Sequence, residues 1–347
     1  MSSIKEVAER AGVSSATVSY VLNNTGNVSE QTRQKVFDVI EEIGYVPNRM
    51  AKGLRAKKTD TIGILVEDIT AFQTPRIING INEYVKKCGY NIILNDLGLL
   101  AKVGKDFERI SEFQPDIEKG FALLSNAQVD GIIYVALHDR DICYVNNIAP
   151  RIPTVFSYCY DTSSRAYCVT YDNEKITRKA IELLIGQNHK EIGVLCGSEG
   201  SKPAQKRFRS VSECMKEHGL SLKNSNVYSG DWEFESGVQA FARYEQAMKK
   251  PSAVFCMNDL MAMGFIDAAL DKGYRIPEDV SIIGFDNDKR CSYSRPRLTT
   301  IDLPLEDMGK KAGNMIIDLI HKKELPQKEV ILDCSLVVRH SAAPAVE

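Results

Sequence analysis

The sequence predicts an all-α helix-turn-helix head followed by a larger α/β core built as two lobes with parallel sheets. Three observations carry this prediction. Two short amphipathic stretches joined by a glycine turn open the chain, and the pattern changes at residue 61 to apolar runs alternating with helix-length segments. The chain also has 347 residues, more than one hydrophobic core usually supports. We therefore expect a head at residues 1–46, a linker at 47–60 and a core at 61–347.

The head begins with a helix over residues 4–11, whose apolar side chains recur at helical spacing. A turn at Gly12 leads to a second helix, for which Ser14 is the expected N-cap. Val18, Val21 and Leu22 should face inward on that second helix. Two short helices with a tight turn between them, and one face left free, are typical of a DNA-binding helix-turn-helix.

A third helix is expected from the N-cap Ser29 to Gly44, where the pattern ends before Pro47. The segment 47–58 then carries five basic side chains and no acidic one, although the whole chain has a net charge of −2. Such a segment next to a helix-turn-helix suits contact with phosphates. We expect it to be disordered alone and to fold when its charge is neutralised.

From residue 61 onward, strand and helix patterns alternate, which indicates parallel sheets covered by helices. We expect two lobes, approximately 61–160 with 290–323 and 161–289 with 324–340. Ligands of such sheets bind beyond the carboxyl ends of the strands, so the cleft between the lobes is the expected binding site. The expected strands are Thr61–Val66, Tyr90–Asn95, Asp130–Val135, Ile152–Phe156, Glu191–Cys196, Ala253–Met257 and Val280–Phe285.

Composition and motifs exclude several classes of protein. No apolar run is long enough to span a membrane, and the polar N-terminus lacks a signal-peptide core, so we expect a cytoplasmic protein. The nine cysteines include no C-x-x-C pair, which argues against a zinc site and a disulfide framework. No catalytic signature or phosphate-binding loop is present. We expect no enzyme activity, no cofactor and no metal.

Several motifs, taken in this order, resemble the LacI/GalR family of bacterial transcription regulators. They include IKEVAERAGVSSATVSYVLN at 4–23, GYVPN at 44–48, VDGII at 129–133, NDLMAMG at 258–264 and SIIGFDN at 281–287. The resemblance covers essentially the whole chain. It implies a periplasmic-binding-protein-like receptor tied by a hinge helix to a DNA-binding head, working as a homodimer on a palindromic operator. A repressor is expected.

The resemblance also assigns DNA contacts. On the second helix it implies base contacts by Ser15, Ala16 and Tyr20, while phosphate contacts are expected of Thr17, Ser19 and Asn23. Relatives commonly carry Arg where this chain has Tyr20, so the base read there is open. In the linker, Leu54 would wedge between base pairs from the minor groove with Ala51 beside it. The surrounding charge would come from Arg49, Lys52, Arg55 and Lys57.

For the effector, the resemblance implies contacts by Arg207, Trp232 and Asp286, and Asn258 offers one donor and one acceptor. In the first lobe, Gln73 and Thr74 replace two aromatic residues that relatives often have, and Phe72 is expected to supply an aromatic face nearby. These residues favour a small polar ligand, a sugar or sugar derivative above all.

Other interpretations remain open. The ligand is alternatively a nucleobase-like corepressor, or the core is a dimerisation scaffold without a ligand, and the sign of regulation is undetermined. An enzyme and a free-standing solute receptor are the competing classes. Between Gly98 and Phe113 the chain is longer than this connection usually needs, which we interpret only as a surface elaboration.

Overall fold

The computed structural model describes residues 3–22, 24–45, 58–104 and 106–345. The chain divides into two compact units, one up to residue 59 and one from residue 60 onward. The first unit is helical and the second contains two six-stranded sheets, in agreement with the predicted fold class. No helix among the described residues is long and apolar enough to cross a membrane.

Three helices form the head, and a serine caps each of them. The helices are α1 (Ile4–Ala11), α2 (Ser15–Leu22) and α3 (Glu30–Glu42). The expected caps Ser14 and Ser29 accept hydrogen bonds from the amides of Thr17 and Thr32, which satisfies first-turn N–H groups. The helices enclose a small core formed by Val7, Ala8, Ala11, Val18, Val21, Val36 and Val39.

The first lobe contains a sheet in which every strand pair is parallel. Its order is β11-β5-β4-β3-β1-β2. The strands are β1 (Thr61–Val66), β2 (Asn91–Asp96), β3 (Gly131–Val135), β4 (Thr154–Ser157), β5 (Tyr167–Tyr171) and β11 (Glu329–Leu332). The helices of this lobe are α5 (Thr74–Lys87), α6 (Leu100–Val103), η1 (Phe107–Phe113), α7 (Gln114–Asn126), α8 (Cys143–Ile148) and α13 (Leu305–Ile320).

The second lobe has the order β12-β10-β9-β8-β6-β7, and only the β10–β12 pair is antiparallel. The strands are β6 (Ile192–Leu195), β7 (Val227–Tyr228), β8 (Ala253–Cys256), β9 (Ser281–Asp286), β10 (Thr299–Asp302) and β12 (Ser335–Val337). The helical elements are α9 (Asn173–Gly186), α10 (Lys202–Glu217), η2 (Asn224–Asn226), α11 (Phe234–Gln246), α12 (Asp259–Asp271) and η3 (Lys289–Ser292).

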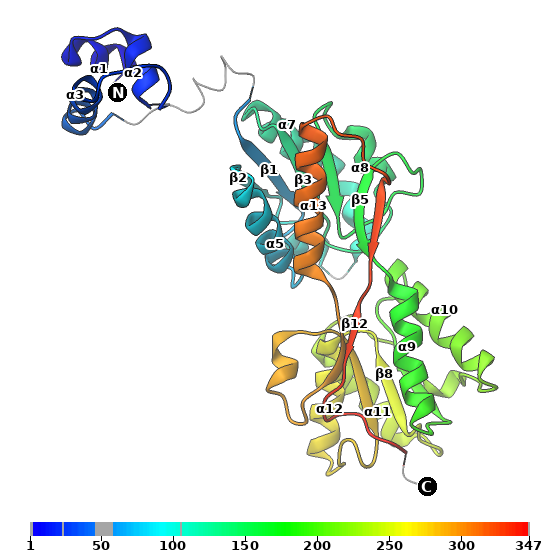
Figure 1. Ribbon diagram of the computed structural model, residues 1–347. Helices are drawn as coiled ribbons and strands as arrows, with labels where there is room; N and C mark the ends of the chain where they lie inside the picture. Colours follow the sequence, from blue (N-terminus) through cyan, green and yellow to red (C-terminus); the bar gives the residue numbers. More distant parts are fainter. Residues whose placement is uncertain (1–2, 23, 46–57, 105, 346–347) are drawn as a thin grey trace. The chain divides into compact units, whose positions relative to one another are not determined.

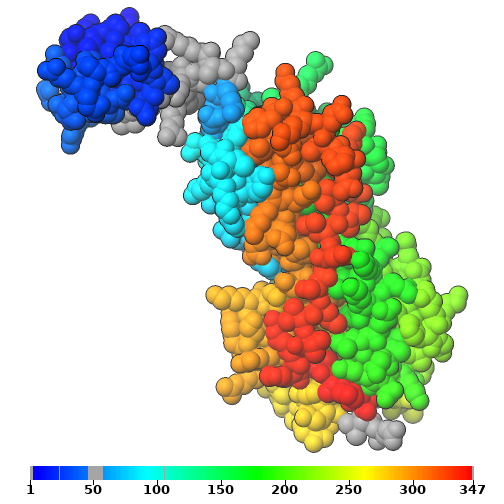
Figure 2. Space-filling model, in the orientation of Figure 1, coloured from blue at the N-terminus to red at the C-terminus, as the bar shows by residue number. Residues whose placement is uncertain are grey.

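The chain passes between the lobes after β5, after β10 and between β11 and β12 (Figure 1). The last passage lies on the surface, where the red C-terminal segment runs from one lobe to the other (Figure 2). All seven predicted strands are present with ends shifted by at most two residues, whereas β5, β7, β10, β11 and β12 were not predicted.

The expected lobe boundaries were therefore wrong in detail. Strand β5 belongs to the first lobe because it pairs with β4 and β11, although 161–289 was assigned to the second. Element η3 and strand β10 belong to the second lobe, where β10 pairs with β9, although 290–323 was assigned to the first. Strand β11, within 324–340, lies in the first lobe. These strands are short, and their assignment depends on pairing that sequence periodicity does not report.

Candidate functional site

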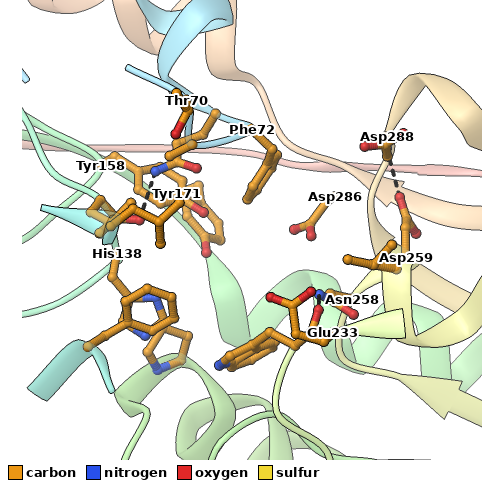
Figure 3. A pocket seen from close by; sticks show the side chains of 18 of the residues that line it. Thr70, Phe72, His138, Tyr158, Tyr171, Glu233, Asn258, Asp259, Asp286 and Asp288 are labelled. Carbon is orange, nitrogen blue, oxygen red and sulfur yellow. Dashed lines mark hydrogen bonds between the residues drawn. The ribbon is translucent and has the colours of Figure 1, made fainter. Parts of the chain in front are cut away.

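A cavity of about 280 Å³ lies between the two lobes, where strand ends of both sheets meet (Figure 3). From the first lobe, residues after β1, β3 and β4 and at the end of β5 line it. From the second lobe, residues after β7 and β8, the end of β9 and helix α10 contribute. The position is the one that parallel α/β sheets favour for ligands. The lining residues used below are Phe72, Leu100, Phe107, Leu137, His138, Tyr158, Tyr171, Pro203, Arg207, Trp232, Glu233, Asn258, Asp286 and Asp288.

Arg207 is a buried cation held in a fixed orientation. Its Nε donates to Asn173 Oδ1 at 2.8 Å, one Nη donates to the hydroxyl of Tyr171 at 3.2 Å, and the other donates to the Met257 carbonyl. The guanidinium lies 3.4 Å from the ring centroid of Phe285. Five N–H groups are available on a guanidinium. Among the described residues three of them have acceptors, so two remain for a ligand.

Asp286 supplies an acceptor without a partner. No described residue donates a hydrogen bond to its carboxylate, although the group lies at the cavity and has a backbone φ of 116°. Burial raises the pKa of Asp286 well above its usual value, and the nearby charge of Arg207 only partly opposes this. A carboxylate that has lost water without gaining donors is well suited to accept hydrogen bonds from a ligand.

Trp232, the chain's only tryptophan, forms an aromatic wall of the cavity. It adopts a φ of 75°, which is rare for a bulky residue. Its ring occupies the space where any other residue at Gly197 would place a Cβ, 2.0 Å from Trp232 Cζ2. Backbone strain at two cavity residues, Trp232 and Asp286, indicates a site whose geometry the surrounding fold imposes.

His138 lies in the opposite lobe from Trp232 and is held by two contacts. Its ring stacks on Phe107 with centroids 4.5 Å apart, and its Nε2 lies 2.9 Å from the Ser201 hydroxyl. Burial lowers the pKa of His138 to about 3, so the ring is neutral near pH 7. Because Ser201 Oγ already accepts from the Ala204 amide, we assign its own hydrogen to His138 Nε2.

Six of the seven predicted effector residues line the cavity: Phe72, Gln73, Arg207, Trp232, Asn258 and Asp286. Thr74 does not, because it lies fully buried in the first turn of α5. The expectation that Gln73 presents a polar group to ligand is also weakened. Its buried amide nitrogen donates to the carbonyls of Ala136 and Leu137.

Asn258 is likewise largely occupied by the protein. Its Oδ1 caps α12 by accepting from the Met261 amide at 2.9 Å, and its Nδ2 donates to the Trp232 carbonyl at 2.8 Å. Because an amide carries two donor hydrogens and two acceptor lone pairs, one of each remains for a ligand, and the predicted contact stays a prediction. Asn258 also fixes the loop that carries Trp232.

The segment 98–113 was interpreted as a surface elaboration, and this too needs correction. Leu99, Val103 and Ile110 form a small buried core with Ala71 and Leu137, and two of the segment's residues, Leu100 and Phe107, line the cavity. Sequence reasoning also missed His138, Tyr158 and Tyr171. Their position just after or at the end of strands β3, β4 and β5 was the only available signal, and β5 itself was not predicted.

In the head, the face of α2 assigned to bases is accessible. Ser15, Ala16 and Tyr20 are exposed, and half of Tyr20 is open to solvent. Thr17 and Ser19 are half-buried, and the Thr17 hydroxyl bonds to that of Ser14 at 2.9 Å. The remaining predicted contacts lie outside the described residues: Asn23, Arg49, Ala51, Lys52, Leu54, Arg55 and Lys57.

A helix-turn-helix unit followed by a two-lobed core with a cavity between the lobes is the architecture of a DNA-binding regulator. Residues 3–48 match the model for bacterial regulatory proteins of the lacI family, and residues 181–342 match a periplasmic binding protein-like domain. The transcriptional repressor PurR of Vibrio vulnificus is 32% identical over 98% of both chains. The chain belongs to the LacI family of DNA-binding transcription regulators and is not an enzyme.

Solved structures agree with the fold. The lac repressor dimer bound to operator and the anti-inducer ONPF matches with a TM-score of 0.84 and 24% identity, over 99% of both chains. A complex of the transcriptional regulator CelR with cellobiose matches with a TM-score of 0.68 and 26% identity, over 99% of this chain and 100% of that one.

Proposed function

We propose that the protein is a cytoplasmic repressor whose affinity for operator DNA is controlled by a small polyhydroxylated ligand, a sugar or sugar derivative, bound between the lobes. The observation that carries the ligand class is the presence of both Asp286 and Arg207 in the cavity lining. Asp286 offers an acceptor without a donor, and Arg207 offers two donors without acceptors. A hydroxyl both donates and accepts, so a sugar ring satisfies both residues at once.

The aromatic side chains support the same class. Trp232 and Phe72 line the cavity, and the apolar face of a sugar ring packs well on an aromatic face. The volume of about 280 Å³ is near the lower end of small-molecule sites, which span roughly 300–1,000 Å³. CelR, a relative of similar fold, was solved with the disaccharide cellobiose.

The DNA-reading part of the proposal rests on family membership and on the exposed face of α2. We propose a homodimer that reads a palindromic operator, with base contacts by Ser15, Ala16 and Tyr20. Leu54, beside Ala51, would act as a minor-groove wedge. The ligand would act by favouring one relative orientation of the lobes, which changes the operator affinity of the dimer.

A binding panel tests the ligand class. Thermal unfolding of the full chain is measured with hexoses, simple glycosides, nucleobases and nucleosides, since a specific ligand raises the melting temperature. We expect stabilisation by a sugar, and an affinity lowered roughly ten- to hundredfold by Asp286→Asn, the loss expected for hydrogen bonds to a charged group.

The matched control is Asp333→Asn, which changes an exposed carboxylate that pairs with Lys175 and does not line the cavity. It should leave affinity unchanged. If nucleobases stabilise the protein and sugars do not, the ligand is a nucleobase-like corepressor and the sugar proposal is wrong. A panel without any stabilising compound would leave the core as a dimerisation scaffold.

A further inference from the structure

The cavity has two ends of opposite character. Asp286, Asp259 and Asp288 lie together on one side, and His138 lies on the other (Figure 3). Glu233 and Arg290 also line the cavity and add charged groups to the first side. Near His138 the lining includes the apolar side chain of Phe107, which stacks on its ring, and those of Leu100 and Leu137, which share a cluster with Phe107. A ligand that fills the cavity must therefore be polar at one end and apolar at the other.

The segment 98–113 builds much of the apolar end. Phe107 stacks on His138 with an interplanar angle of 21°. Leu100 and Phe107 also pack against the cluster formed by Leu99, Val103, Ile110, Leu137 and Ala71. Asp68, which follows β1, fixes the start of the segment by accepting from the Leu100 amide at 2.9 Å, and it holds Thr70 through its other oxygen. The apolar wall is thus anchored to the first sheet.

The same wall meets the second lobe. His138 bonds to Ser201, and its ring lies 6.2 Å from that of Trp232 at an interplanar angle of 68°, an edge-to-face arrangement. A Cβ at Gly200 would lie 3.3 Å from Glu108 Cγ, so η1 approaches the loop before α10. Phe107, His138 and Trp232 form a continuous row of rings from one lobe to the other.

We infer that the effector is a glycoside with an apolar, ring-containing aglycone, and that segment 98–113 selects for this aglycone through Phe107. This inference rests on the sugar ligand proposed above and specifies its chemistry. The hydroxyl-rich ring lies between Asp286 and Arg207, and the aglycone lies against Phe107, His138 and Leu100. A free hexose leaves the apolar end filled only by water.

The polarity of the wall also disfavours a nucleoside. A nucleobase carries ring nitrogens and exocyclic groups that need hydrogen-bond partners. At the apolar end, Leu100, Phe107 and Leu137 offer no side-chain donor or acceptor. The polar groups beside them are two donors, the Nδ1–H of His138 and the buried, unpartnered Nε1–H of Trp232, so the N–H groups of a nucleobase would find no side-chain acceptor among these residues. A phenyl group meets no such penalty there.

The test compares matched methyl and phenyl glycosides of the same hexoses, with nucleosides as a further set, by calorimetric titration of the full chain. For the hexose that binds, we expect the phenyl glycoside to bind about tenfold or more tightly than the methyl glycoside, from burial of apolar area and ring stacking. Phe107→Ala should remove this preference, so that the two glycosides bind with similar affinity.

Phe113→Ala is the matched control, because Phe113 packs in the same small cluster but does not line the cavity. It should keep the preference, which separates loss of the wall from general disturbance of the segment. Equal affinity of wild type for both glycosides would overturn this inference and leave the sugar proposal intact. Tighter binding of nucleosides would overturn it as well, and binding of nucleobases without any glycoside would overturn both proposals.

Discussion

At Asp286 a buried carboxylate has no hydrogen-bond donor from the described part of the chain, and its pKa is raised well above the usual value. When the folded protein keeps a proton that the unfolded chain has already released, the folding stability falls as the pH rises from the unfolded-state pKa to the folded-state pKa. Asp259, whose burial raises its pKa to about 7, acts in the same direction. His138 acts in the opposite direction, but only below its ordinary pKa of about 6.5.

We therefore predict that the melting temperature of the ligand-free protein falls as the pH rises above about 6.5, where His138 no longer contributes and the raised pKa values of Asp259 and Asp286 still act. Asp286→Asn should reduce the slope because the amide does not titrate. Calorimetric scans of both proteins across this range measure it. An identical slope in the two proteins would show that Asp286 is not the group responsible.

Gly197 gives a second prediction at this scale. A methyl group there would lie 2.0 Å from the Trp232 ring, so Gly197→Ala must displace the ring. We expect ligand affinity to fall about tenfold or more, the size of effect expected when an aromatic wall is lost. The emission of the single tryptophan should also shift.

The control is Gly186→Ala at the end of α9, where no atom lies within 4 Å of the added Cβ. Titration of ligand monitored by tryptophan emission serves for all three proteins. Wild-type affinity in Gly197→Ala would mean that Trp232 takes no part in binding.

At the scale of elements, α2 presents Tyr20 half-exposed at the end of the reading face, with its ring against Gly26. Tyr20→Phe keeps this packing and removes only the hydroxyl. We predict that the variant loses discrimination at one base pair of each operator half-site, by up to about 1–3 kcal/mol, and that ligand affinity is unchanged.

Competition binding with operators substituted one position at a time provides the measurement. The positions whose discrimination changes identify the base pair under Tyr20. If every substituted operator ranks as it does for wild type, Tyr20 contacts the DNA backbone only or does not contact it.

Elements with strong local signals could be predicted from the sequence. The helices of the head follow their serine caps and apolar spacing, and the seven strands with long apolar runs appear as expected. Strand β5 has the pattern Tyr-Cys-Val-Thr-Tyr and β10 the pattern Thr-Thr-Ile-Asp, so burial in the sheet interior, not local pattern, determines them. Segment 98–113 has no helical repeat long enough to predict α6 and η1.

The cavity residues also divide into those that lie in sequence motifs and those that do not. Arg207, Trp232 and Asp286 lie in motifs and were predicted, and the structure brings them to one cavity. His138, Tyr158 and Tyr171 lie in no motif, and only strand register and chain crossing bring them there. Gln73 and Asn258 were placed correctly, but their hydrogen bonds to backbone groups could not be foreseen from residue type.

At the scale of the whole core, helix α10 of the second lobe joins the lobes through several polar contacts. Arg207 bonds to Tyr171, and Lys206 lies 3.6 Å from the Asp139 carboxylate and 3.9 Å from the centroid of the Tyr160 ring. Ser201, which caps α10, bonds to His138. We propose that a ligand that contacts Arg207 and the first lobe changes the balance between relative lobe orientations, and that this change is the physical basis of the control of DNA binding.

The central claim is that occupancy of the cavity changes operator affinity, and one titration tests it most directly. Fluorescence anisotropy gives the Kd of the full chain for an operator obtained by selection, with and without a saturating concentration of the bound glycoside. We predict a change of about tenfold or more in wild type, within the usual range of coupling between sites, and a smaller change in Asp286→Asn at a concentration that just saturates wild type. An unchanged operator Kd, with tryptophan emission showing the cavity filled, would contradict the account.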